Sequence, residues 1–178
     1  MRVKGIYVKI LDMMTSVEEF YEEAQKLAQI FDSWVEKINL AAVADHVCYK
    51  CGDEEEFSGM RKMFEAESKF IYQSIISGRR IAVIKFVRPV STSMGDIWYL
   101  ELAAQKPDGS QLSGFDHVEI YPLKGTMEAL AEEMMAQGVR LEKIVRPHHT
   151  TYDGVIEGRL KIRLEDEALV EKIKRDEM

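Results

Sequence analysis

The segment FDHVEIYP, residues 115–122, echoes an earlier element of the chain, ADHVCYKC at residues 44–51. Their histidines are two of only four in 178 residues and lie 117 − 46 = 71 positions apart. Both segments alternate between apolar and polar side chains as half-buried strands do. A weak internal repeat of this kind is typical of a chain built from two copies of one supersecondary unit. We therefore expect each segment to be the first strand of one copy.

The residues that follow each segment predict the same order of elements. After the first come a helix capped by Asp53 with Glu56 and the strand-like runs KFIYQSII, RRIAVIKFV and DIWYLELAA. After the second come a helix from Thr126 to about Gln137 and the runs VRLEKIVRP, HHTTYDG and GRLKIRLED. The turn-rich linker KPDGSQLSG separates the two halves. The sequence therefore predicts an α+β protein with two βαβββ modules.

A further helix precedes the first module. Ser16 and Glu19 form a capping box, and apolar residues recur at helical spacing from there to about Asn39. The expected organisation is a single domain with an N-terminal helical region at 1–40, a first module at 41–106 and a second module at 107–178.

Charge and composition exclude several kinds of partner. Lys and Arg number 24 against 31 Asp and Glu, for a net charge of −7, and no basic face emerges that could follow a phosphate backbone. No apolar run reaches the roughly 18 to 20 residues of a membrane span, and MRVKGIYVKILDMM lacks a signal-peptide cleavage pattern. We expect a cytoplasmic protein without nucleic-acid or membrane partners. The defining motifs of serine hydrolases, P-loop proteins and Rossmann proteins are missing from the sequence.

Residues two apart on a strand share a face, so the predicted strands present a common polar face away from the helices. Several of its residue types are typical metal ligands or acid/base groups: His46, Cys48, Tyr99, Glu101, His117, Glu119, Arg163 and Glu165. A solvated sheet face would give the same alternation, so the residues alone leave a ligand cluster and an ordinary solvent-facing surface both open.

The cysteines, Cys48 and Cys51, form half of a zinc knuckle, but no second C-x2-C is present to complete it. His148 and His149 offer two more ligands, at a spacing that zinc ribbons do not use. Reduced, half-buried cysteines are the expectation, with a structural zinc and a redox pair as alternatives. His149 is also a candidate for substrate contact, and exposed surface is the alternative for it.

The order ADHVCYKC, SGRRIAVIKF with Pro89, GFDHVEIYP and TYDG resembles the bacterial YecM family over roughly Val17 to Lys174. The arrangement also resembles the vicinal oxygen chelate superfamily of glyoxalases, type I extradiol dioxygenases and methylmalonyl-CoA epimerases. The resemblance implies that the modules form a cupped, half-barrel mixed sheet.

The resemblance also implies a metal site on the first and last strands of the modules. Its ligands would be His46, Glu101 and His117, with Glu165 in the fourth position unless Arg163 occupies it. The metal would be divalent iron, manganese, nickel or zinc. Glu119 and Tyr99 are then the candidate catalytic groups. The candidate substrate-binding residues are Arg163, Cys48 and His149.

The implied function is metal-dependent chemistry on a small oxygenated metabolite, by an isomerase, a lyase or a dioxygenase that stabilises an enolate or activated oxygen. The alternative is a metal-free protein that binds a small molecule in the same cleft, because a fold does not determine an activity. A purely structural subunit is a third reading. Related folds often pair modules between subunits, so a homodimer is one option for the assembly.

Overall fold

The computed structural model describes residues 14–68, 70–147, 149–158 and 160–176. The elements of these residues, in chain order, are α1 (Val17–Val35), β1 (Ala42–Lys50), α2 (Glu54–Glu65), β2 (Ile71–Ile76), β3 (Arg79–Thr92), β4 (Gly95–Ala103), β5 (Gly114–Pro122), α3 (Met127–Ala136), β6 (Glu142–Val145), β7 (Thr150–Glu157), β8 (Leu160–Leu164) and α4 (Leu169–Asp176). The order strand, helix, three strands occurs twice. The predicted pair of βαβββ modules behind an N-terminal helix is confirmed.

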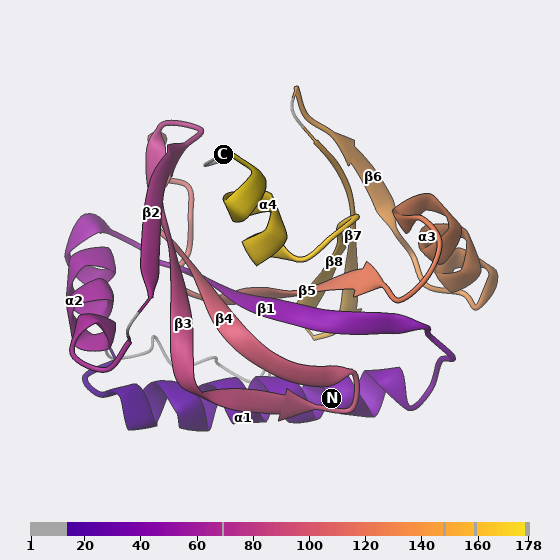
Figure 1. The fold of residues 1–178 in the computed structure, drawn as a ribbon, viewed down its shortest axis with the longest axis horizontal. Helices are drawn as coiled ribbons and strands as arrows, with labels where there is room; N and C mark the ends of the chain where they lie inside the picture. Colours follow the sequence, from indigo (N-terminus) through magenta and orange to yellow (C-terminus); the bar gives the residue numbers. More distant parts are fainter. Residues whose placement is uncertain (1–13, 69, 148, 159, 177–178) are drawn as a thin grey trace, which may run out of the picture.

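All eight of these strands form one mixed sheet in the order β2-β3-β4-β1-β5-β8-β7-β6. Within each module the first strand pairs in parallel with the last, β1 with β4 and β5 with β8. The modules join where β1 and β5 pair antiparallel. The sheet curves, and its two ends rise on the side where α4 lies (Figure 1). The first strands of the two modules therefore meet at the middle of a curved sheet.

Helix α1 holds the two modules together from the other side of the sheet (Figure 1). Its N-terminus is capped as predicted, because the Ser16 side chain accepts a hydrogen bond from the backbone N–H of Glu19. The helix contacts β3 of the first module and both β5 and β7 of the second. Phe20 lies fully buried against the rings of Tyr49 and Phe115, which come from different modules. The apolar face of α1 therefore stabilises both modules at once.

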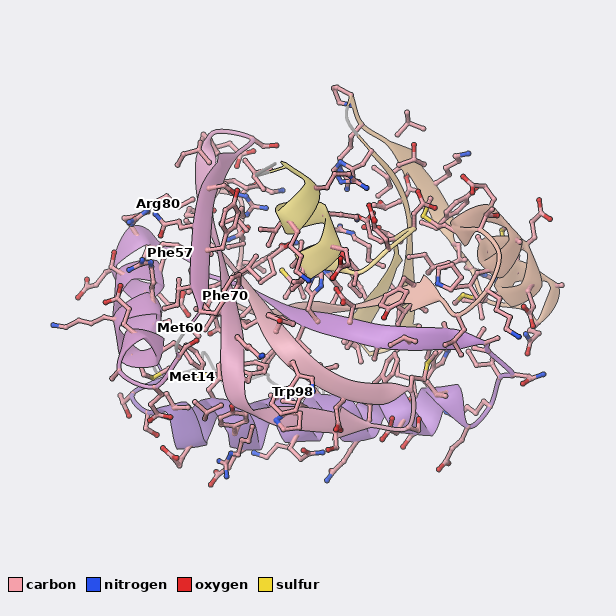
Figure 2. All side chains as sticks on the ribbon, viewed as in Figure 1. Met14, Phe57, Met60, Phe70, Arg80 and Trp98 are labelled. Atoms are coloured by element: carbon pink, nitrogen blue, oxygen red, sulfur yellow. The ribbon has the colours of Figure 1, made fainter. Side chains whose placement is uncertain are left out.

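Helices α2 and α3 cover one strand of each module. Helix α2 contacts β4 and α3 contacts β5. Figure 2 shows Phe57 and Met60 on α2, and the guanidinium of Arg80 lies 4.6 Å from the centre of the Phe57 ring. The Asp53 side chain accepts a hydrogen bond from the backbone N–H of Glu56, as the sequence predicts, and Thr126, the expected start of the second helix, is the N-cap of α3. The apolar side chains of the strands thus face these helices, which leaves the polar set on the opposite face.

The structure differs from the sequence prediction at three elements. Helix α1 ends at Val35 instead of about Asn39, because its last turn tightens through bonds from Lys37 N–H to Trp34 and from Ile38 N–H to Val35. Strand β3 continues beyond Pro89 to Thr92; the β3–β4 register shifts between Lys85 and Val90, which removes the proline from regular pairing. Helix α4 was not predicted at all.

None of the described helices is long and apolar enough to cross a membrane.

Candidate metal centre

Two β-bulges lie where β1 pairs with β5, one in each strand. In this register Asp45 of β1 has no partner on β5, and Asp116 of β5 has no partner on β1. Each of these aspartates immediately precedes a histidine, His46 or His117. A bulge turns the extra residue out of the regular alternation of side chains. The repeated Asp-His element of the sequence therefore marks two matched bulges at the junction of the modules.

The bulged aspartates hold the neighbouring imidazole rings. Asp45 Oδ2 lies 2.8 Å from His46 Nδ1, and Asp116 Oδ2 lies 2.8 Å from His117 Nδ1. A ring whose Nδ1–H donates to a carboxylate keeps the lone pair of Nε2 free. Contacts of this type fix the tautomer and the orientation of histidines that bind metals.

The free nitrogens of the two histidines are the most unusual feature of the site. His46 and His117 are 0% and 1% exposed, and the Nε2 atom of each has no hydrogen-bond partner among the described residues. The ring centres are 6.2 Å apart. Leaving a buried polar atom unpaired costs about 1–3 kcal/mol, so such atoms call for an explanation. A metal ion bound by both nitrogens would supply one.

Carboxylates and a thiol surround this pair. Glu101 Oε2 lies 3.8 Å from His46 Nε2, whereas Glu119 Oε1 lies 3.6 Å from the other nitrogen, Nδ1. Cys48 Sγ lies 3.3 Å from Glu101 Oε1. Among the described residues, ligand atoms lie within 4.8 Å of one another in two groups: His46, His117 and Glu119, and Cys48, Glu101 and His117. The two groups share His117, so they form one continuous cluster.

Strand pairing brings these side chains together. His46 lies opposite Tyr99 on β4 and opposite Glu119 on β5. Cys48 lies opposite Glu101 and His117 in the same two strands. The half-buried Tyr99 packs edge-on against the ring of Phe70 at 6.2 Å. These polar side chains of β1, β4 and β5 therefore share one face of the sheet, as predicted, and lie next to one another there.

Arg163 reaches the cluster from β8, where it pairs with Glu119 in the strand register. Its guanidinium donates two hydrogen bonds to Asp153 of β7, from Nε at 3.0 Å and from Nη2 at 2.7 Å. This fork holds the arginine in place at the edge of the site. Its positive charge also acts on Glu101, whose pKa it helps to lower.

Glu165 lies beyond the end of β8, where it contacts α4. Lys172 Nζ of that helix donates to Glu165 Oε2 at 2.5 Å, and His149 Nε2 lies 3.9 Å from Glu165 Oε1. Glu165 belongs to neither ligand group of the described residues. Helix α4 is also tied to the cluster, because Leu169 N–H donates to Asp45 Oδ2 at 2.9 Å.

The buried charges shift one another's protonation. Burial would lower the pKa of His46, but the carboxylates of Glu119, Asp45 and Glu101 outweigh it and raise the pKa to about 9. Burial, together with Glu165 and Glu101, raises the pKa of Glu119 to about 8 despite the neighbouring imidazole. Both shifts favour the protonated form of the group at neutral pH, so a metal ion that binds His46 would have to displace a proton.

The second histidine shows the opposite behaviour. Burial lowers the pKa of His117 to about 4, and the charge of Arg163 adds to this effect. Burial opposes ionisation of Glu101 too, but His46, His117 and Arg163 hold its pKa below the usual value. A neutral imidazole beside an ionised carboxylate is the donor pair that a divalent cation requires.

Sequence reasoning missed Asp45, Asp116 and Asp153. Asp116 is contacted from three sides, since Lys50 Nζ at 2.8 Å and Lys161 Nζ at 3.0 Å donate to it as well as His117. Strict alternation would place the aspartates on the helix-covered face, away from the histidines. The signal that could have found two of them is the repeat itself, because both copies retain the aspartate as well as the histidine.

The donor set of the cluster fits a divalent metal ion. Two imidazole nitrogens lack hydrogen-bond partners among the described residues, and two carboxylates and one thiol have ligand atoms within 4.8 Å of a ligand atom of His46 or His117. The alternative zinc site would use Cys48 and Cys51, which are both buried and form no disulfide, with His148 and His149. His148 lies outside the described residues.

The fold and this cluster define the protein as a double βαβββ protein with a candidate metal centre between its modules. The sequence model of the YecM protein family matches residues 9–170. The chain therefore belongs to the YecM family. No curated protein matches the chain.

One solved structure has a similar fold over most of both chains. A structure described as "Structural Genomics, Protein EC4020" is 20% identical, with a TM-score of 0.70 over 90% of this chain and 92% of that chain. A single-substitution variant of Streptomyces coelicolor methylmalonyl-CoA epimerase, in complex with 2-nitronate-propionyl-CoA, is 14% identical, with a TM-score of 0.45 over 72% of this chain and 100% of that chain. The methylmalonyl-CoA epimerase from Mycobacterium tuberculosis is 17% identical, with a TM-score of 0.45 over 74% and 91%.

Proposed function

We propose that the protein binds a divalent metal ion through Nε2 of His46 and Nε2 of His117, and that it uses this centre on a small oxygenated molecule. The observation that supports the proposal is the pair of buried nitrogens that have no hydrogen-bond partner among the described residues. Each ring is held by a carboxylate at its other nitrogen, as in histidines that bind metals.

Glu101 is the better third ligand, and Glu119 is the better base. Glu101 lies on the Nε2 side of His46, where the metal would be, at 3.8 Å. Glu119 lies on the Nδ1 side at 3.6 Å, which leaves its carboxylate free to take and return a proton. Burial raises the pKa of Glu119, so this carboxylate takes up a proton more readily than an exposed one.

Two residues are candidates for the fourth position around the metal, Glu165 and Arg163, and each already has a side-chain partner in the structure. Glu165 remains the predicted fourth ligand. To reach the metal, its carboxylate would have to give up the hydrogen bond that it accepts from Lys172 Nζ at 2.5 Å. Arg163 is positioned by Asp153, so its contribution is a fixed positive charge beside the cluster. That charge would favour an anionic group on the substrate.

The metal would supply Lewis-acid stabilisation of negative charge on an oxygen of the substrate. The protein's own residues do the rest: Asp45 and Asp116 orient the imidazoles, and Glu119 moves a proton. Tyr99, opposite His46 in the register, remains a candidate to act on the substrate, and His149, next to Glu165, remains a candidate for substrate contact. The resemblance to the vicinal oxygen chelate superfamily supports isomerase, lyase or dioxygenase chemistry within the cell.

The proposal is tested by measuring the metal content of the protein with inductively coupled plasma mass spectrometry. The protein is purified without chelators and without nickel-affinity chromatography. We expect near-stoichiometric iron, manganese, nickel or zinc in the wild type and its loss in the His46→Ala, His117→Ala double variant. The matched control is His149→Ala, which removes a histidine that is 45% exposed and should leave the metal in place. A wild type that contains no metal and takes up none would leave a metal-free binding protein as the remaining function.

A further inference from the structure

Cys48 contributes a thiol to the cluster, next to Glu101 and His117. Its side chain is fully buried, on the same face of β1 as His46, and Sγ lies 3.3 Å from Glu101 Oε1. The ligand atoms of Cys48, Glu101 and His117 lie within 4.8 Å of one another. His117 contributes an Nε2 atom that is buried and unpaired among the described residues.

We propose that Cys48 is itself a ligand of the metal, so that the centre consists of one thiolate, two imidazoles and one carboxylate. The inference rests on the proposed metal site and specifies which ion it takes. A thiolate selects zinc, cobalt or iron over the hard ions manganese and magnesium.

Two distances in the cluster are close to the spacing between neighbouring ligands of a tetrahedral ion. Bonds of about 2.3 Å to sulfur and about 2.0–2.2 Å to nitrogen or oxygen place neighbouring tetrahedral ligands roughly 3.5 Å apart. Cys48 Sγ and Glu101 Oε1 are 3.3 Å apart, and Glu101 Oε2 and His46 Nε2 are 3.8 Å apart. The two distances involve different oxygens of Glu101, so Cys48 and His46 each lie near tetrahedral spacing from one oxygen of the same carboxylate.

The pairing of the strands keeps the thiol in this place. Cys48 pairs with Glu101 on the parallel side of β1 and with His117 on the antiparallel side. Cys48 is therefore positioned between Glu101 and His117, the two other residues of its ligand group. When the metal binds, the S–H bond breaks, the sulfur keeps the electron pair to form the metal bond, and the proton leaves to solvent.

Cys51 provides an internal control. It is the other cysteine of the chain, it is also fully buried, and it belongs to the apolar core cluster. Cys51 is absent from both ligand groups of the described residues. A change at Cys51 therefore tests the effect of losing a buried thiol without removing a ligand.

The test is to load the full-length protein with Co²⁺ and to record its absorption spectrum. A thiolate ligand gives a sulfur-to-cobalt charge-transfer band in the near ultraviolet, and a tetrahedral site gives intense visible bands. We expect both in the wild type and in Cys51→Ala. Cys48→Ser should lose the ultraviolet band and at least about tenfold in Zn²⁺ affinity, with little change in Mn²⁺ affinity.

Cobalt that binds the wild type without the charge-transfer band would overturn the role of Cys48 and leave the proposed function intact. A wild type that binds no cobalt, zinc, iron, nickel or manganese would overturn both. The wild-type spectrum decides the question even if the Cys48→Ser variant does not fold.

Discussion

At the scale of single residues, the site depends on two aspartates whose position breaks the regular pattern of a strand. Alternation along β1, β4 and β5 is enough to predict that His46, Cys48, Glu101, His117 and Glu119 share a face. It cannot predict Asp45 and Asp116, because a bulge adds one residue and reverses the alternation locally. Phe115 shows the same reversal: it is two residues before His117 but packs against Phe20 on the helix side.

Replacing Asp116 by Asn should weaken metal binding. The change removes the negative charge that holds His117 Nδ1–H and leaves Lys50 and Lys161 without their shared partner. The expected loss is about 10- to 100-fold in metal affinity, which competition with a chromophoric chelator can measure. Asp108→Asn, an exposed change in the linker, is the control. Equal affinity in D116N and the wild type would show that the aspartate does not position the ring.

At the scale of elements, α4 is the feature that the sequence did not predict. It is eight residues long, and helices of this length are not stable in isolation, so local periodicity is a weak guide to them. Its stability comes from tertiary contacts: the bond from Leu169 N–H to Asp45, the ion pair of Lys172 with Glu165, and the burial of Ile173. The elements of the two modules were predictable because their strands and helices repeat with clear periods and caps.

Lys172→Met should loosen α4. Glu165 is 7% exposed at its side chain, and removal of the lysine leaves this carboxylate buried without its partner. We expect amide hydrogen exchange in residues 169–176 to accelerate at least about tenfold, equivalent to about 1.4 kcal/mol, with little change in β1 and β5.

The control for this prediction is Lys174→Met in the same helix. Lys174 pairs with Glu171 at the surface, and both side chains are more than half exposed. A surface pair of this kind contributes little to stability. If both variants accelerated exchange equally, the Lys172–Glu165 pair would not be what holds the helix.

At the scale of the whole molecule, the candidate centre lies at the junction of the modules. One histidine comes from β1 and the other from β5, and these strands pair antiparallel at the middle of the sheet. Helix α1 packs under both modules, so it keeps this junction in one register. The duplication explains why the two histidines lie close together, because each module contributes its first strand to the β1–β5 pair that joins the modules. The resemblance to the vicinal oxygen chelate superfamily implied that the two histidines share a site, whereas the ion and the substrate depend on atoms that a repeat does not specify.

The most direct test of the metal centre is a crystal structure of the protein loaded with Zn²⁺, with anomalous diffraction recorded on both sides of the zinc absorption edge. We predict one strong anomalous peak about 2.0–2.1 Å from Nε2 of His46 and Nε2 of His117, with Glu101 in contact with it. Two Nε2 atoms that contact only water or each other, with no anomalous peak between them, would contradict the central claim.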